Sequence, residues 1–282
     1  MTATIIDAME TGSQEFEMPW NATAPFPRNA RTQLAYRGVN ILVLWAQAMK
    51  HEYTSALWAT YQQWHELGAQ VRKGEKSTAV VFWKFCGETE EAATDTETPD
   101  SSDNRRCCAR AYHVFNATQV DGFEVPLITA LPDAERIRHA ETFFANAGVR
   151  VIEGGSRAYY RLDCDEIHMP PFSAFKKPDY FYSVLGHEAV HAVGHPSRSN
   201  RQLTNRFGSE AYAAEELIAE LGSAFISAEL KLDTEPRADH APYVRNWLAV
   251  LRHDKRAIFT AASKAQEAVD WLLKSQTQQE AV

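Results

Sequence analysis

The sequence lacks the features of a membrane or secreted protein. No apolar run among its 282 residues reaches the ~18 residues that a transmembrane helix needs. The first 20 residues contain no Lys or Arg and no long apolar stretch, so we expect no secretory signal. Only four cysteines occur, with no CxxC pair, which favours reduced thiols over disulfides or a zinc finger. We therefore expect a cytoplasmic protein with no membrane partner.

Charge is spread unevenly along the chain. The net charge of −8 hides a basic segment, because residues 19–86 carry eight Lys or Arg against three acids, a net of +5. Residues 87–104 carry seven acids and no base. Their sequence, GETEEAATDTETPDSSDN, has no aromatic residue and cannot bury a core, so it is predicted to be a disordered acidic insertion.

Apolar patterns divide the chain into two parts. In the first part, helices are predicted at about residues 32–51 and 59–67. The β-rich runs 79–85 and 109–116 are predicted to form a hairpin whose connection is lengthened by the acidic insertion, which loop entropy tolerates well. The pattern changes near residues 121–132, and we place the domain boundary there.

The second part has a mostly helical pattern with a few short strands. Its predicted helices are at about residues 133–147, 178–194, 209–230, 238–253 and 256–275, and its predicted strands are at 149–153, 157–161 and 166–169. The expected fold class is α+β, with an N-terminal α+β domain at residues 1–125 and a mostly helical domain with a small sheet at residues 126–282.

A metal-site motif lies in the second part, at residues 187–191. The sequence there is His-Glu-Ala-Val-His. Residues four apart lie on one face of a helix, so His187 and His191 can direct two imidazole nitrogens at one cation. Glu188 is offset from that face and is predicted to act as the catalytic general base. The motif therefore predicts a zinc-hydrolase type of site.

A third ligand is expected from the glutamates downstream. Glu216 and Glu220 are again four residues apart, so one can bind the metal while the other accepts the N–H of a ligand histidine. The string from Glu215 to Glu220 is similar to the Asn-Glu-x-x-Ser-Asp signature of thermolysin-like gluzincins. That match favours Glu216 as the ligand and Glu220 as the supporting acid, although the reverse assignment stays open. Glu215 is expected to face solvent.

The basic segment is also rich in aromatic residues. Five of the seven tryptophans fall within residues 19–86. Single-stranded nucleic acid is bound by aromatic rings that stack on bases and by Lys or Arg that follow the phosphates. The alternative is an aromatic core with a solvated charged face, and for Trp45, on the apolar side of its helix, this alternative is preferred.

Four strings together resemble a known family. They are Tyr-Arg-Gly-Val-Asn at residues 36–40, GAQVRKGEK at 68–76, HEAVH followed by Gly-His-Pro at 187–196, and EELIAELG at 215–222. In this order they resemble the ArdC-type antirestriction proteins of conjugative plasmids, which are related to TraC-type primases. The resemblance covers nearly the whole chain except the acidic insertion and the extreme C-terminus.

The resemblance implies an N-terminal domain that binds single-stranded DNA and a C-terminal zincin-like metallopeptidase domain. Members of the family protect incoming plasmid DNA from host restriction enzymes, so those enzymes or a peptide substrate are further possible partners. The implied cofactor is Zn²⁺ or another divalent metal such as Mn²⁺. The alternative is a cytoplasmic zinc metallopeptidase whose N-terminal module recruits it to DNA. The residues expected to contact DNA are Arg28, Arg31, Tyr36, Arg37, Asn40, Arg72, Lys73, Lys76 and Trp83.

Hydrolysis needs further groups besides the metal and its base. An extended substrate is expected to pair with the strand at residues 166–169, taken as a sheet edge. A donor for the oxyanion is also required, and Tyr182, Tyr212 and His240 are suitable by residue type.

Overall fold

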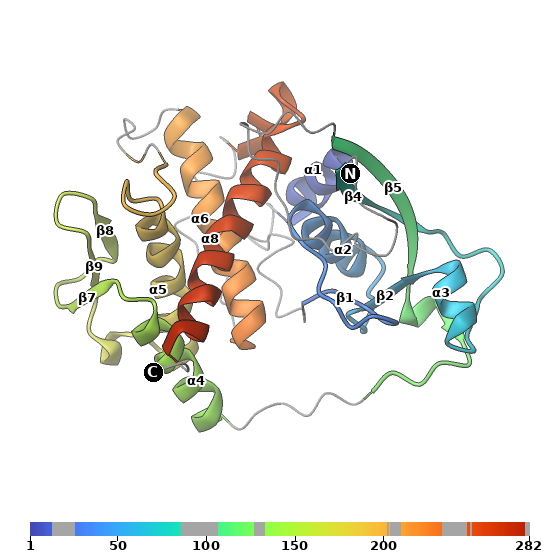
Figure 1. The fold of residues 1–282 in the computed structure, drawn as a ribbon, viewed down its shortest axis with the longest axis horizontal. Helices are drawn as coiled ribbons and strands as arrows, with labels where there is room; N and C mark the ends of the chain where they lie inside the picture. Colours follow the sequence, from blue (N-terminus) through green and yellow to red (C-terminus); the bar gives the residue numbers. More distant parts are fainter. Residues whose placement is uncertain are drawn as a thin grey trace. The chain divides into compact units, whose positions relative to one another are not determined.

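The computed structural model describes residues 1–12, 26–85, 107–126, 133–201, 203, 210–232, 247–248 and 250–279 (Figure 1). Its contacts divide the chain into two compact units, Phe26–Ile128 and Thr129–Val282. The first 25 residues, which include α1 (Thr2–Gly12), are shared between the two units. The predicted acidic insertion at 87–104 and most of the predicted helix at 238–253 lie outside the described residues.

The first unit is built on a four-stranded sheet in the order β1-β2-β5-β4. Its strands are β1 (Arg28–Asn29), β2 (Leu57–Thr60), β4 (Thr78–Phe85) and β5 (Cys107–Asn116), and a separate ribbon pairs β3 (Gln70–Val71) with β6 (Val120–Asp121). β4 and β5 pair antiparallel from Thr78↔Val114 to Phe85↔Cys107, so the strands of the predicted hairpin are present.

Helix α2 (Val39–Lys50) begins later than predicted. The chain before it forms β1 and a turn, and Gly38 adopts φ +55 at the helix start, a conformation that suits glycine. Asn40, in the first turn, donates to the Val81 carbonyl and accepts from the Val81 N–H, both at 2.8 Å. Its amide thus hydrogen-bonds to β4 as a neighbouring strand would and fixes α2 on the sheet.

Helix α3 (Tyr61–Glu66) is also shorter than predicted, because residues 57–60 join the sheet as β2. Thr60 and Gln63 form a capping box, in which each backbone N–H donates to the other residue's side-chain oxygen. The helix ends at Glu66, and the chain turns away at Gly68, where φ is +77. The 3-10 turn η2 (Ala117–Gln119) then joins β5 to β6.

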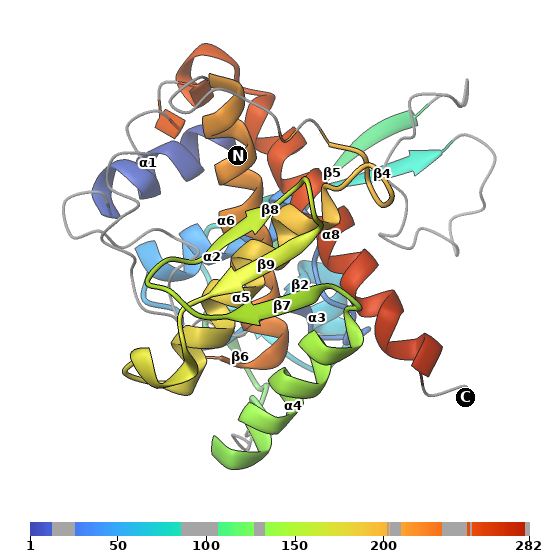
Figure 2. The ribbon, with the colours of Figure 1, turned by 90° about the vertical axis from the view of Figure 1, so that its left-hand side faces the viewer.

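The second unit contains a three-stranded sheet in the order β7-β9-β8 (Figure 2). β9 (Glu166–Met169) lies in the middle, parallel to β7 (Arg150–Glu153) and antiparallel to β8 (Tyr159–Arg161). The expectation that residues 166–169 form an edge for a substrate is therefore wrong, since both sides of the strand are already paired. Its central position agrees with its burial, since Ile167 and Met169 are almost fully buried.

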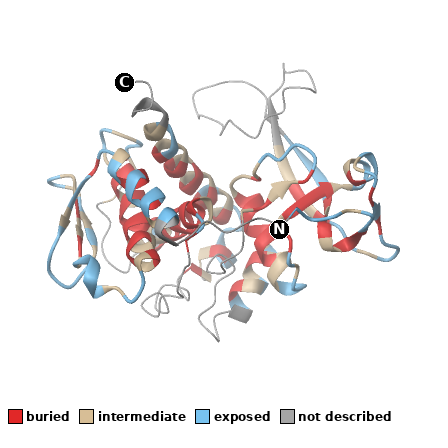
Figure 3. Cartoon of the chain, turned by 90° about the horizontal axis from the view of Figure 1, so that it is seen from below, coloured by how far each residue is buried: buried red, intermediate tan, exposed pale blue. Residues whose placement is uncertain are grey.

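The helices of this unit are α4 (Asp133–Asn146), α5 (Pro178–Val193), α6 (Glu210–Leu230) and α8 (Ala257–Gln279), with the 3-10 turn η3 (Phe172–Ala174) before α5. α6 packs against both α5 and α8, and buried residues run along the helices (Figure 3). A Cβ at Gly222 of α6 would lie 2.6 Å from Val190 Cγ2 of α5, so the two helices approach closely because residue 222 has no side chain. Ser223 also donates to the Ser183 carbonyl at 2.8 Å and ties α6 to α5.

The predicted α+β fold class is confirmed. Among the described helices, none is long and apolar enough to cross a membrane.

Candidate metal centre

Helix α5 carries the two histidines. Pro178 at its start and Asp179 in its first turn favour helix initiation, and the helix continues without a break through residues 187–191. His187 and His191 therefore project from one face, and their Nε2 atoms lie 3.2 Å apart. Their side chains are only 6% and 15% exposed, so both imidazoles are held in a largely buried site.

Helix α6 brings Glu216 to these nitrogens. Its Oε2 lies 3.5 Å from His187 Nε2, and its Oε1 lies 3.8 Å from His191 Nε2. A tetrahedral ion with bonds of ~2.0–2.1 Å separates its ligand atoms by about 3.3 Å, so these three donors are spaced to fit one ion. The structure thus brings together the three residues predicted as ligands.

The Glu216 carboxylate is held in its charged form. Burial raises its pKa, but the hydrogen bond from His187, the charges of both histidines and the Tyr212 hydroxyl outweigh burial and lower the pKa to about 2. Metal ligands must be deprotonated, so an ionised carboxylate between two imidazoles suits a divalent cation.

Two further carboxylates face the other nitrogens of the histidines. Glu220 Oε2 lies 3.4 Å from His187 Nδ1, and Glu215 Oε1 lies 3.2 Å from His191 Nδ1. A carboxylate at Nδ1 keeps the proton on that nitrogen and leaves the Nε2 lone pair for a metal. Glu220 lies at ion-pair distance from His187 Nδ1, and its supporting role stays a prediction. Glu215 lies within hydrogen-bond distance of His191 Nδ1, a contact that was not expected.

Glu215 corrects the expectation that this residue faces solvent. It is buried and accepts a bidentate pair of hydrogen bonds from Arg201, with Arg201 Nη2 at 2.9 Å from Oε1 and Nε at 3.2 Å from Oε2. Burial raises the pKa of Glu215. The hydrogen bonds from His191 and Arg201 lower the pKa by more than burial raises it, so the net shift is downward. The sequence did contain a signal for the burial of Glu215. Helix α6 is largely apolar, and buried residues lie on both sides of residue 215.

Glu188, the predicted base, lies next to His187 on α5 and is 6% exposed. Within the described parts of the chain, no hydrogen bond or ion pair engages its carboxylate. Its carboxylate has no described partner that competes for a proton, and its role as general base stays a prediction.

The three expected oxyanion donors have different outcomes. Tyr212 is one helical turn before Glu216 and donates a hydrogen bond to it, so it lies at the site. Tyr182 stacks on Phe144, with ring centroids 5.9 Å apart, and lines a different pocket. His240 lies outside the described residues.

Two of the residues expected to contact DNA are instead structural. Tyr36 is 2% exposed and its hydroxyl is directed at the Trp58 carbonyl, 3.4 Å away. Asn40 is 4% exposed and bonds to β4, as described above. Both side chains are buried in this structure, so it gives them a packing role, and their expected contact with DNA stays a prediction. Asn40 is buried because it anchors α2 to β4, and Tyr36 is buried because its ring lies in the core of this unit.

The other expected DNA contacts differ in how accessible they are. Arg31 pairs with Glu66 at 2.9 Å, and Arg72 pairs with Glu75 at 2.9 Å while also donating to the Thr118 carbonyl. Arg28 and Arg37 are half-buried, Lys73 and Lys76 are exposed, and Trp83 lies on β4 opposite Ala109.

The tryptophans of this unit belong mainly to its core. Trp45, Trp58 and Trp64 are at most 3% exposed, as expected for Trp45 from its helical position. The exposed aromatic rings are instead Tyr61 and Tyr112, at 52% and 36% exposure. Neither was among the predicted DNA contacts, since the exposure of one ring among several depends on tertiary packing that the sequence does not show.

Two histidines on one helix, a glutamate on the next, and a free carboxylate beside the first histidine define a zincin-like domain. The chain matches the family described as "Zincin-like metallopeptidase" over residues 138–264, and the "N-terminal domain of anti-restriction factor ArdC" over residues 1–115. It belongs to the ArdC family of antirestriction proteins, because a solved member of that family is similar to it over nearly the full length of both chains.

The metal-free crystal structure of the antirestriction protein ArdC from plasmid R388 superimposes with a TM-score of 0.79 at 37% identity, covering 98% of this chain and 96% of that one. Its Mn(II)-bound form gives 0.77 at 38% identity, covering 97% and 96%. The family and the donor set together support the predicted divalent metal.

Curated relatives extend the comparison. Protein y4eC of Sinorhizobium fredii strain NGR234 is 48% identical over 98% of this chain and 91% of its own length. A DNA primase TraC of Escherichia coli is 35% identical over 98% of this chain, but only 27% of the primase is covered. The chain therefore spans about a quarter of that primase, and the expected relation to TraC-type proteins is confirmed for that part.

Proposed function

We propose that this protein is an antirestriction factor that binds single-stranded DNA through its N-terminal domain, residues 1–125, and protects incoming DNA from host restriction enzymes. The main support is that the chain covers 96% of a solved antirestriction protein at 37% identity, so both domains are shared in one order. The zincin-like domain, residues 126–282, would then either assist this protection or hydrolyse a peptide.

The metal would be held by His187, His191 and Glu216, whose atoms meet the spacing of a tetrahedral ion. Two imidazoles and one carboxylate suit Zn²⁺, and Mn²⁺ is supported by the Mn(II)-bound relative. A bound metal of this kind supplies Lewis acidity at a polarised carbonyl. Glu215 and Glu220 would keep the two imidazoles in the tautomer that leaves Nε2 free.

Glu188 would accept the proton of an attacking water at its carboxylate, since no described group competes for it. Tyr212 would be the nearest phenol to the reacting carbonyl, but its hydroxyl is already engaged with Glu216. Among the described residues, no other oxyanion donor is assigned to the metal site, so we expect weak proteolysis at most. Protection against restriction is therefore assigned mainly to DNA binding.

DNA binding is supported by the exposed aromatic and basic groups of the first unit. Tyr61 lies beside Gln70, Arg72 and Lys73 around one surface hollow. On β5, the Arg110 guanidinium lies over the Tyr112 ring at 5.6 Å from its centroid, and the Phe82 ring meets Tyr112 in a T-shaped contact at 5.3 Å. The Tyr112 ring is still 36% exposed, and its exposed part is proposed to contact a base. We therefore propose Tyr61 and Tyr112 as contacts to DNA in addition to the predicted basic residues, since Tyr36 and Asn40 are buried.

Direct binding measurements test this proposal. The full chain should bind single-stranded DNA more tightly than duplex of equal length, with an affinity that falls steeply with salt. Tyr61→Ala and Tyr112→Ala should each weaken binding by about 1–3 kcal/mol, whereas Tyr159→Ala, an exposed tyrosine of the other unit, should not. Equal affinity for duplex and single strands in a gel-shift titration would contradict the proposal.

The second candidate is a zinc metallopeptidase recruited to DNA, and the uncommitted Glu188 carboxylate is the observation that favours it. Glu188→Gln separates the two, because it keeps the ligands and removes the base. We expect this variant to bind metal and DNA normally and to retain most protection against restriction. Complete loss of protection, with DNA binding unchanged, would make hydrolysis the function.

A further inference from the structure

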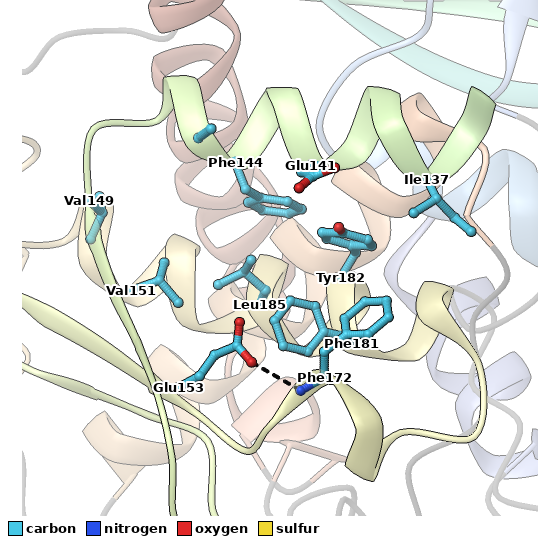
Figure 4. A pocket seen from close by; sticks show the side chains of 11 residues that line it. Ile137, Glu141, Phe144, Val149, Val151, Glu153, Phe172, Phe181, Tyr182 and Leu185 are labelled. Carbon is cyan, nitrogen blue, oxygen red and sulfur yellow. Dashed lines mark hydrogen bonds between the residues drawn. The ribbon is translucent and has the colours of Figure 1, made fainter. Parts of the chain in front are cut away.

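A pocket in the second unit shares no lining residue with the metal cluster. It has a volume of about 580 Å³ and is lined by parts of α4, β7, η3 and α5 (Figure 4). That volume is within the ~300–1,000 Å³ usual for ligand sites. β7 lies at the edge of the three-stranded sheet, and its core-facing side chain Val151 is 38% exposed because the pocket lies against it.

Aromatic rings form most of the apolar wall. Phe144 and Tyr182 stack at 5.9 Å with an interplanar angle of 4°, and Phe172 meets Phe181 at 5.0 Å with an angle of 64°. Phe172 is 40% exposed, a large value for a phenylalanine within an aromatic cluster. Ring faces carry partial negative charge, so a wall of this kind attracts organic cations as well as apolar groups.

The charged groups of the described pocket lining are all acidic. Glu141 of α4 and Glu153 of β7 line the pocket, and among the residues that the structure describes no Lys, Arg or His does. Within the described chain, neither carboxylate forms an ion pair. Glu153 Oε2 accepts the Phe172 N–H at 3.1 Å, which holds this carboxylate beside the ring (Figure 4).

Both carboxylates act on the same phenol. Burial raises the pKa of Tyr182, and the charges of Glu141 and Glu153 raise it further. Two negative charges thus lie on opposite sides of one aromatic pocket, with no basic group of the described chain to balance them.

We propose that this pocket binds the cationic side chain of a lysine or arginine from a polypeptide partner. The charge would lie between Glu141 and Glu153, and the aliphatic stem would cover Val151 and Phe172, as such side chains do on apolar surfaces. Charge complementarity is the reason for choosing a cation, because a purely apolar occupant would leave the two carboxylates partly desolvated without a partner.

Three single-residue probes test the proposal with the full chain: Nα-acetyl-arginine amide, Nα-acetyl-lysine amide and the neutral Nα-acetyl-norleucine amide. Titrations followed by NMR should show saturable shifts of Phe172 and Tyr182 resonances with one or both cations. The comparison of arginine with lysine identifies the preferred head group. Norleucine should bind at least about five-fold more weakly.

Matched variants locate the site. Glu141→Gln and Glu153→Gln should each weaken cation binding by about two- to five-fold, and the pair together by about ten-fold. Phe172→Leu keeps apolar volume but removes the ring, and should also weaken binding. Glu135→Gln, an exposed change on the same helix outside the pocket, should have no effect.

Equal binding of norleucine would overturn the cationic specificity. Absence of saturable shifts with all three probes would overturn the site itself. Unchanged affinity in the Glu141→Gln/Glu153→Gln double variant, with the fold intact by circular dichroism, would place the binding elsewhere.

Discussion

The close approach of α5 and α6 at Gly222 leads to a prediction about the metal centre. Gly222→Ala would place a Cβ 2.6 Å from Val190 Cγ2 and 3.0 Å from Val190 Cγ1. Carbon atoms in contact normally lie ~3.5–4.0 Å apart, so the helices must separate by about 1 Å. Glu216 and Glu220 are on the moving helix and the two histidines are on the other, so the ligands would separate as well.

The magnitude follows from two opposing effects. Alanine is favoured over glycine within a helix by about 1 kcal/mol, which would stabilise α6. Overpacking in a dense core costs about 1–3 kcal/mol, which exceeds or cancels that gain. The His187–Glu216 distance of 3.5 Å would increase beyond the spacing of a tetrahedral ion. We expect metal affinity to fall by about 10–100-fold, the range seen when ligand orientation is disturbed.

Competition with a fluorescent chelator would measure the metal Kd, and thermal unfolding of the metal-free protein would measure stability. Val190→Ala in the Gly222→Ala background removes the two clashing methyl groups and should restore metal affinity. Gly186→Ala is the matched control, because its Cβ would lie 3.6 Å from its nearest neighbours, Phe144 Cζ and Ser223 Oγ, although residue 186 adjoins His187. An unchanged Kd in Gly222→Ala would refute the idea that this helix contact positions the ligands.

Further predictions concern the acids of α6. Glu216→Ala should abolish stoichiometric metal by elemental analysis, whereas Glu220→Ala should weaken binding by only ~10–100-fold; the opposite pattern would reverse their assignment. Glu215→Ala should lower stability by about 3–5 kcal/mol in denaturant unfolding, because Arg201 keeps a buried charge without its partner, and Glu215→Gln should do so less. The metal-free protein should lose stability as pH falls from about 4.5 towards 2, because the folded pKa of Glu216 is lowered to about 2. Its contribution to stability is fully present above the unfolded pKa and is lost as pH falls through the folded pKa. Glu216→Gln should flatten that part of a melting-temperature profile against pH.

The sequence predicted the parts of the site that depend on periodicity within one helix. His187 and His191 are four residues apart, and so are Glu216 and Glu220, so each pair shares a face whatever the tertiary structure. The central position of β9 was not predictable in this way. A strand of four residues gives no signal of which neighbours pair with it, since that depends on the register of β7 and β8.

The basic aromatic segment shows why DNA contacts are harder to predict from a shared sequence string. Tyr36 and Asn40 belong to a string shared with a DNA-binding family, and that association led to a contact prediction. The structure gives these two residues a packing role, because Asn40 pairs with the open edge of β4 and Tyr36 lies in the core. A shared string reports a shared fold as readily as a shared interface, and burial distinguishes the two.

The presence of three acids where one ligand is needed has an electrostatic explanation. Helical rotation of ~100° per residue spreads Glu215, Glu216 and Glu220 over roughly 140° of α6, so one carboxylate faces the Nε2 atoms and the other two reach the Nδ1 atoms. With neutral imidazoles and the Arg201 guanidinium, these groups sum to a charge of −2. That charge matches a divalent cation, and a buried site is expected to be close to neutral when filled.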